Sequence, residues 1–211
     1  QSDRTSFALQ QGQIRFVLTT PLRPDNEIAA HIHRHGDGVR DVALCVDDVR
    51  YAWKQTTRRG ARSVREPFEI QDADGVVKMA SIATYGDTIH TFVERHNYRG
   101  PFLPGYQPVA HDPLARPAGL VSVDHVACNV GWHEMSRWAD FYRAVMGFSL
   151  CRDFDCSEQQ PSALVYKVIA NGNGRVEFPI QEPAEGLEQP EVEKYLEYYH
   201  GSGVQRIALA T

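Results

Sequence analysis

The sequence contains no long apolar run and no block of like charges. No stretch reaches the roughly 18 apolar residues that a membrane helix needs, so we expect no membrane partner. The formal net charge is −5, with acidic and basic residues interspersed, so we expect no nucleic-acid partner either. The GxSxG, GxGxxG and P-loop motifs are also missing, which argues against a serine hydrolase, a dinucleotide enzyme and an NTPase.

Cysteine is scarce, and no two cysteines form a CxxC pair. Cys151 and Cys156 are too far apart to form one half of a zinc knuckle, so we expect these two, Cys45 and Cys128 to be free thiols in a reducing cytoplasm. The polar N-terminus argues against a signal peptide. There is no initiator Met, and the chain stops at Thr211 inside an expected strand, so we expect a chain truncated at both ends.

The composition is that of an ordinary globular protein, with 42% hydrophobic and 23% charged residues. Period-two alternation predicts two paired strands within 6–19, and 37–46 is expected to form a further strand. A capped, amphipathic pattern predicts a helix over 47–60. More strands are expected around a hairpin turn at 72–75, and the last of them ends at Glu94.

Residues 97–119 are rich in proline and glycine, which predicts a linker. The same order of elements then returns, with Gly147 expected to end an amphipathic helix and residues 171–174 to form a hairpin turn. The expected elements are strands at 121–130, 162–170 and 175–180, helices at 136–148 and 190–200, and a last strand from 203.

A short strand motif occurs three times along the chain. Each copy has valine at its second place, a β-branched residue at its fifth and alanine at its sixth. The copies are GVRDVAL (38–44), SVDHVAC (122–128) and GVQRIAL (203–209). A helix and further strands follow the first two copies, so the repeat predicts a β-α-β-β-β unit that is used more than once, and an α+β fold class.

This repeat also predicts two modules and a cavity. The first strand of each unit is expected to line the cavity, and the fourth place of the motif to point inward. A triad of two histidines and one carboxylate there would leave open coordination places on iron. Taken alone, His125 also fits a packed core histidine, and both interpretations stay open. The predicted divisions are a first module at 1–96, the linker at 97–119 and a second module at 120–211, and the fourth places are Asp41, His125 and Arg206.

Three other groups of side chains have a simpler interpretation than a site. His31, His33 and His35 could bind zinc or nickel from one side of a strand, but Gly36 follows at once, and a helix end or a loop fits better. The remaining groups are the acidic residues of 191–197, which are typical of a solvated helix face, and the tyrosines at 195, 198 and 199, which are expected to pack.

Seven segments resemble one known family in their order and spacing. They are HGDGVRDVAL, IATYGDTIHTFVER, GPFLPGY, VDHVACNV, FYRAVMGF, FPIQEP and GSGVQRIAL. They span essentially the whole chain and are similar to the 4-hydroxyphenylpyruvate dioxygenase family, whose architecture 4-hydroxymandelate synthase shares. The resemblance implies the vicinal-oxygen-chelate fold, like that of glyoxalase and dihydroxybiphenyl dioxygenase. It also implies a non-catalytic first module and an iron-binding second module, with one strand and one helix missing at the front and a larger part at the back.

The resemblance assigns the metal ligands residue by residue. His125, in VDHVACNV, matches the family's first iron ligand. The second ligand is the histidine of a V-Q-H-I-A-L motif, and Arg206 occupies that place here. A guanidinium has no lone pair to offer a metal ion, so Arg206 cannot replace an imidazole. The carboxylate ligand would lie beyond Thr211.

The resemblance also implies a substrate pocket that departs from the family pattern. Gln205 matches a glutamine that contacts substrate. Tyr166 stands where the family has serine, Gln181 where it has asparagine, and Glu191 where it has a helix glutamine. The added ring, the longer amide and the added charge are each expected to alter which keto acid fits.

The implied activity is that of an oxidoreductase, an Fe(II)-dependent dioxygenase. With O₂ as co-substrate it would convert 4-hydroxyphenylpyruvate, or a related aryl pyruvate, to homogentisate and CO₂ in tyrosine and phenylalanine catabolism, as a cytoplasmic homo-oligomer. This fragment alone is expected to be inactive. Three alternatives stay open: a 4-hydroxymandelate synthase, a metal-crippled relative that binds aromatic acids at Arg206, and a bleomycin-resistance-like or glyoxalase-like module.

Overall fold

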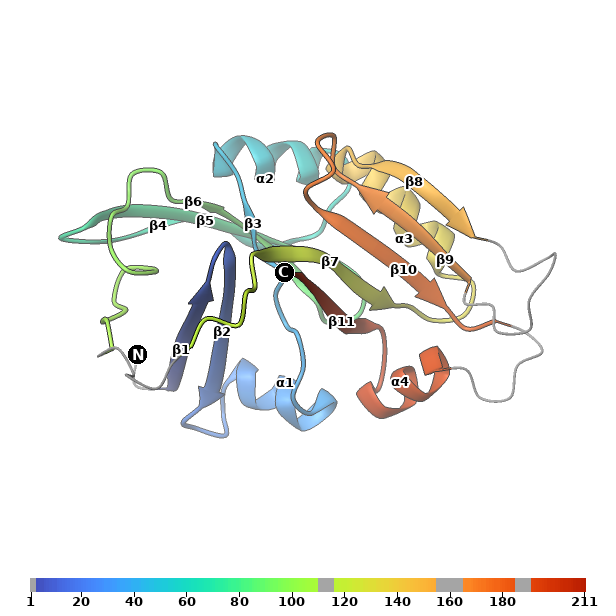
Figure 1. Ribbon diagram of the computed structural model, residues 1–211, viewed down its shortest axis with the longest axis horizontal. Helices are drawn as coiled ribbons and strands as arrows, with labels where there is room; N and C mark the ends of the chain where they lie inside the picture. Colours follow the sequence, from blue (N-terminus) through green and yellow to red (C-terminus); the bar gives the residue numbers. More distant parts are fainter. Residues whose placement is uncertain (1–2, 110–115, 155–164, 185–190) are drawn as a thin grey trace. The chain divides into compact units, whose positions relative to one another are not determined.

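The computed structural model describes residues 3–109, 116–154, 165–184 and 191–211 (Figure 1). Contacts between residues divide the chain into two compact units. Unit 1 contains residues 1–40, 85–87 and 120–211, and unit 2 contains residues 41–84 and 88–119. These units are defined by contacts and the predicted modules by the repeat, so the module boundaries stay a prediction.

Unit 2 is built on a four-stranded sheet. Its elements are β3 (Leu44–Cys45), α2 (Val49–Arg58), β4 (Ser63–Asp72), β5 (Gly75–Ala83) and β6 (Ile89–Glu94). The strand order is β3-β6-β5-β4, with β3 parallel to β6 and the other pairs antiparallel. The Asp48 carboxylate accepts a hydrogen bond from the backbone N–H of Tyr51, so α2 has the predicted N-terminal cap.

The strand predicted at 37–46 is much shorter than expected. Only Leu44–Cys45 pairs regularly, and Asp41 forms an isolated bridge with Ile89. The side chain of Asp41 accounts for the difference. It accepts hydrogen bonds from the backbone N–H and the hydroxyl of Thr91, so a donor of β6 is bound by a carboxylate and not by a neighbouring backbone.

Unit 1 contains a five-stranded sheet, a separate two-stranded ribbon and the remaining helices. The sheet order is β11-β7-β10-β9-β8, in which β10 runs parallel to β7 and the other pairs are antiparallel. The elements are β1 (Arg4–Gln11), β2 (Ile14–Pro21), α1 (Glu27–His35), β7 (Ser122–Asn129), α3 (Met135–Phe141), η1 (Tyr142–Met146), β8 (Ser149–Phe154), β9 (Val165–Ala170), β10 (Glu177–Glu182), α4 (Glu191–Tyr199) and β11 (Gly203–Ala210).

The predicted β-α-β-β-β unit is present twice. The order β7-β10-β9-β8 in one sheet matches β3-β6-β5-β4 in the other, and in each case a helix follows the first strand. First and last strands of each unit run parallel, which requires the long connection that the helix and hairpin provide. The α+β prediction is therefore confirmed, and each unit carries its helix on one face of its sheet.

The helix predicted at 136–148 changes type before it ends. Residues 135–141 form α3, residues 142–146 continue as one π-helical turn, and the segment ends at Gly147 as predicted. Tyr142 lies at the start of the wider turn and is completely buried against Phe178. A π-helical turn inserts one extra residue per turn, and sequence periodicity does not show it.

The three clustered histidines lie in a helix that the sequence pattern did not predict. Asn26 caps α1, since its side chain accepts from the backbone N–H of Ala29 at 2.9 Å. His31 and His35 share one face of α1, and His33 is exposed on another. The expectation that these histidines lie at the end of a helix is confirmed. The alternative interpretation, in which they alternate along a strand, is wrong.

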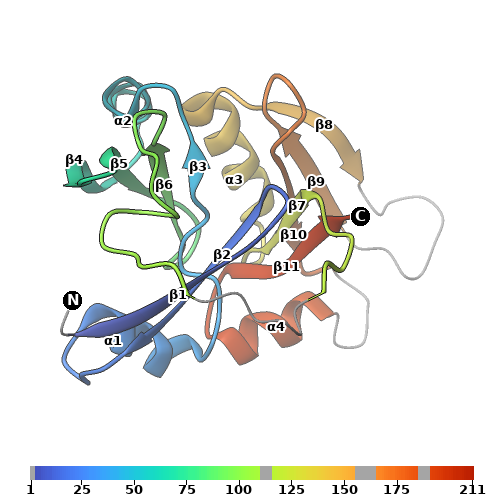
Figure 2. The same ribbon diagram turned by 60° about the vertical axis from the view of Figure 1, so that its left-hand side comes forward.

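The ribbon of β1 and β2 pairs in continuous register from Arg4–Pro21 to Gln11–Ile14. Phe7 and Leu18 are opposite each other, and both remain more than half exposed, as does Leu9. Figure 2 shows the ribbon as a twisted pair of strands with α1 following it. None of the helices in the described residues has the length and hydropathy to cross a bilayer.

Candidate active site

Helix α3 distinguishes the two faces of the five-stranded sheet. The rings of Phe178 on β10 and Tyr142 lie 5.1 Å apart between centroids, and Lys167 Nζ on β9 donates to Ser136 Oγ on α3 at 3.2 Å. Residues that are paired across two neighbouring strands point their side chains to the same face of the sheet, and consecutive residues along a strand point theirs to alternate faces. Ile180, Cys128 and Phe178 therefore face α3, and the residues between them point to the opposite face.

Five residues, four of them predicted site residues, point to this opposite face. Gln181 is paired with Asn129 on β7 and with Tyr166 on β9, and Arg206 on β11 is paired with Ala127. Along β7, side chains alternate between the two faces. Cys128 faces α3, so Ala127, Asn129 and His125 all point to the opposite face. We call this surface the site face and define it by His125, Asn129, Tyr166, Gln181 and Arg206.

His125 and Arg206 are diagonal neighbours on the site face. His125 is opposite Ala208, and Arg206 is opposite Ala127, two residues further along each strand. Diagonal positions of this kind lie about 7–8 Å apart, within reach of long side chains. His125 Nδ1 donates to the Asp124 carboxylate at 2.7 Å, and its Nε2 has no hydrogen-bond partner among the described residues. The side chain of His125 is 31% exposed.

These residues do not form the complete iron site that the family resemblance implies. His125 Nε2 could hold a metal ion, because the bond from Nδ1 to Asp124 fixes the tautomer. Arg206 offers no ligand atom. Within residues 3–109, 116–154, 165–184 and 191–211, no group of three or more His, Cys, Asp or Glu side chains is placed to hold one ion.

Two buried amides lie side by side on the site face. Asn129 is completely buried and Gln181 is 7% exposed. Asn129 Nδ2 and Oδ1 and Gln181 Oε1 have no hydrogen-bond partner within the described part of the chain. An unpaired buried polar group is unfavourable by about 1–3 kcal/mol. Sequence reasoning missed Asn129, although an asparagine within the apolar run VDHVACNV was a usable signal.

Replacing Asn129 with leucine is expected to leave the free energy of unfolding unchanged or raise it by about 1 kcal/mol, because the unpaired amide atoms are removed at similar volume. Urea denaturation measures the effect. Asn171→Leu is the matched control, since Asn171 Oδ1 accepts from the backbone N–H groups of Arg175 and Val176, and we expect a loss of about 1–2 kcal/mol there. A comparable loss in Asn129→Leu would mean that the amide is bonded after all.

Helix α4 covers one end of the site face. Gly203 is opposite Asn129, and a Cβ at Gly203 would collide with the rings of Tyr199 and Tyr195. Tyr195 donates its hydroxyl proton to the carbonyl of Val204 at 3.0 Å, and burial raises the pKa of Tyr195 above its usual range. The predicted packing is confirmed for Tyr195 and Tyr199, whose rings stack, and it is wrong for Tyr198, which is 75% exposed.

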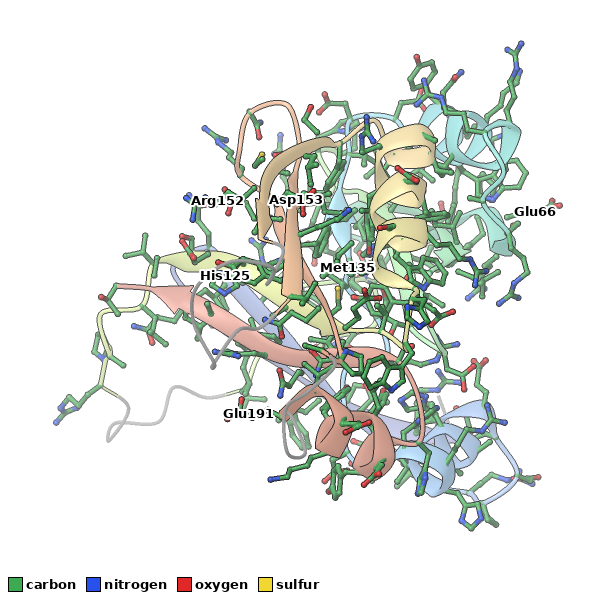
Figure 3. All side chains as sticks on the ribbon, turned by 90° about the vertical axis from the view of Figure 1, so that its right-hand side faces the viewer. Glu66, His125, Met135, Arg152, Asp153 and Glu191 are labelled. Carbon is green, nitrogen blue, oxygen red and sulfur yellow. The ribbon has the colours of Figure 1, made fainter. Side chains whose placement is uncertain are left out.

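The other predicted substrate residues lie at the margins of this region. Gln205 is the extra residue of a β-bulge between Val204 and Arg206, so it interrupts the alternation of β11. Glu191 is the first residue of α4 and is exposed (Figure 3). A hollow of about 350 Å³ lies beside Gln205 and Arg206, and it is also lined by Tyr195, Tyr198, Tyr199 and residues 37–39.

A second polar cluster joins α1 to α4 in unit 1. His35 is buried, its Nδ1 donates to the Tyr199 carbonyl at 2.5 Å, and its Nε2 lies 2.9 Å from the Asp87 carboxylate. Asp87 also binds Arg34 at 2.5 Å. The hydrogen bond from His35, with help from Arg34, lowers the pKa of Asp87. Burial lowers the pKa of His31, which lies against His35.

The cysteines agree with the expectation of free thiols where the structure describes them. Cys128 is buried on the α3 side, and burial raises the pKa of its thiol to about 12. A thiol with so high a pKa is a poor nucleophile at neutral pH. Cys45 and Cys151 are exposed and unpaired, and Cys156 lies outside the described residues.

Comparison with known proteins gives one consistent result. The chain is 41% identical over 98% of its length to the 4-hydroxyphenylpyruvate dioxygenase of Coccidioides posadasii, and 40% identical over 98% to that of Dictyostelium discoideum. The chain is homologous to the 4-hydroxyphenylpyruvate dioxygenases. It spans 56% and 58% of the length of these two dioxygenases. No protein-family model matches the chain.

Solved structures agree with this dioxygenase resemblance. A triple mutant of 4-hydroxymandelate synthase from Streptomyces coelicolor superposes with a TM-score of 0.81 at 27% identity, over 98% of this chain and 59% of that one. A fusion of a xylose isomerase-like TIM barrel with a 4-hydroxyphenylpyruvate dioxygenase, at 19% identity and a TM-score of 0.68, shares the fold. The predicted family resemblance and the vicinal-oxygen-chelate fold are confirmed.

Proposed function

We propose that the protein containing this chain is a dioxygenase that converts 4-hydroxyphenylpyruvate, or a related aryl pyruvate, with O₂ to homogentisate and CO₂. The observation that supports this proposal most strongly is the sequence identity of about 40% with 4-hydroxyphenylpyruvate dioxygenases over 98% of the chain. The site face supports the proposal, because it brings His125, Gln181 and Tyr166 to one side of one sheet. The reaction belongs to tyrosine and phenylalanine catabolism.

The proposed cofactor is Fe(II), with O₂ as co-substrate. Bound iron would supply the redox chemistry with O₂, which amino-acid side chains do not supply themselves. His125 would be the ligand from this chain. The position of the second histidine holds Arg206, so we expect weaker metal binding than a two-histidine site gives.

The remaining site residues are proposed to orient the aryl keto acid. Tyr166 and Gln181 would contact it from the middle of the sheet, and Gln205 from the bulge of β11. Glu191, at the start of α4, would disfavour a ligand carboxylate near that end, since like charges repel. These contacts would place the keto acid group toward His125 and Arg206, away from Glu191.

The decisive experiment uses the full-length protein. Fe(II) is titrated into the native protein and into Arg206→His, and O₂ uptake with 4-hydroxyphenylpyruvate is followed with an electrode. We expect Arg206→His to bind Fe(II) about 100-fold more tightly, because it restores an imidazole ligand. Absence of O₂ uptake in both proteins would reject the dioxygenase proposal, and equal iron affinities would contradict the effect assigned to Arg206.

Two other functions are supported by specific observations. The superposition with 4-hydroxymandelate synthase favours hydroxymandelate as the product, which chromatography of the reaction would detect. Arg206 favours a metal-crippled relative that binds aromatic acids without turnover. We also propose a cytoplasmic homo-oligomer, and light scattering of the full-length protein tests its assembly.

A further inference from the structure

Arg206 is a charged side chain on the site face. It is exposed, and within the described residues it forms no hydrogen bond and no ion pair. The residue opposite it is Ala127, and the residue opposite His125 is Ala208, so both long side chains project over short neighbours. Arg206 borders a hollow of about 350 Å³, where a group that complements its guanidinium could be bound.

Charged groups of both signs lie on the same sheet as Arg206 or next to it. Asp124 is the acidic group beside His125, and its carboxylate accepts the Nδ1 proton of that histidine at 2.7 Å. Arg152 on β8 is paired with Val168 and so points to the site face as well, but three strands separate β8 from β11, and Arg152 is too far away to contact a ligand held by Arg206. Glu191, an acidic residue of α4, is exposed at the start of that helix (Figure 3).

We propose that Arg206 binds the carboxylate of the aryl α-keto acid directly, so that this end of the ligand is held without a metal ion. This inference rests on the substrate class of the proposed function. A guanidinium presents two parallel N–H groups that match the two oxygens of a carboxylate, which makes the contact both strong and directional. His125 Nε2 stays available to a metal ion or to the keto end of the ligand.

The arrangement distinguishes this chain from a site in which iron alone holds the keto acid. An imidazole at the same place would hold the metal ion, and the metal ion would hold the carboxylate. The arginine reaches the same carboxylate with its own positive charge. Binding of the keto acid should therefore survive removal of metal, and it should depend on the guanidinium.

Isothermal titration of the full-length protein in EDTA tests the inference with 4-hydroxyphenylpyruvate as the probe. We expect Arg206→Gln to weaken binding about 10-fold or more, and Arg206→Lys to weaken it less, because a lysine keeps the charge and loses the two-point geometry. The matched control is Arg152→Gln, which removes a cation from the same face, and we expect a change of less than about twofold. Binding of 4-ethylphenol, which has no carboxylate, should be equal in all four proteins.

The outcomes separate this inference from the proposed function. Equal binding by native protein and Arg206→Gln would overturn the role of Arg206, as would an equal loss in Arg152→Gln. Either result leaves O₂ uptake as an independent test of the dioxygenase. Conversely, Arg206-dependent binding without O₂ uptake would reject the dioxygenase and retain Arg206 as the carboxylate anchor of a binding protein. Circular dichroism of each variant establishes that the fold is unchanged.

Discussion

Replacing Gly86 with alanine is expected to lower the free energy of unfolding by about 3 kcal/mol or more. Gly86 has a φ of 56°, which disfavours any residue with a Cβ. A Cβ at this place would also collide with the backbone carbonyl of Ser202, which cannot rotate away as a side chain can. Urea denaturation followed by circular dichroism measures the loss.

Gly174→Ala is the matched control for this prediction. Gly174 has a similar φ of 66°, but a Cβ there would meet nothing within 4 Å. We expect a loss of about 1–2 kcal/mol, which is the backbone strain alone. Equal losses in the two variants would show that the contact between Gly86 and Ser202 contributes nothing to stability.

Replacing His35 with alanine is expected to lower the free energy of unfolding by about 3 kcal/mol. The change removes the hydrogen bond to the Tyr199 carbonyl, the contact with Asp87 and the stacking on the Tyr199 ring, whose centroid lies 4.5 Å away. The buried carbonyl at the end of α4 then has no donor from α1. Urea denaturation at neutral pH measures the effect.

His33→Ala is the control, because His33 is exposed on the same helix, and its expected effect is within about 0.5 kcal/mol. Lowering the pH also tests the cluster, through the contribution of Asp87 to the free energy of unfolding. The pKa of Asp87 is lowered in the folded protein, so its contribution is fully present above the unfolded pKa of about 3.9 and is lost as the pH falls through the lower folded value. A loss in His33→Ala as large as that in His35→Ala would contradict the role of the buried cluster.

Periodicity and turn signals predicted the repeated unit well, because each of its strands buries one side. The hairpin turns at 72–75 and 171–174 are where they were expected, and Gly147 ends its helix. The placement of four predicted residues on one face also follows from alternation. Their roles as metal ligand and substrate contacts stay predictions.

The elements that sequence reasoning missed depend on contacts between distant residues. Helix α1 is short, and His35 at its end is buried against residues far away in the sequence, Tyr199 and Asp87. Extending the repeated motif toward its N-terminal side would have indicated helix α1. The segments HGDGVRDVAL from His35 and HGSGVQRIAL from His200 are identical at six of ten places. Both segments follow a helix, and the two helices are neighbours (Figure 2).

The ribbon of β1 and β2 has a consequence for handling the protein. Its two strands pair with each other, and Phe7, Leu9 and Leu18 are exposed on them. Free strand edges beside exposed apolar side chains are templates for intermolecular pairing, and charged residues interrupt such pairing. The ribbon carries two, Arg4 and Arg15, so concentrated solutions of this chain should aggregate through its first strands and leave the site face unaffected.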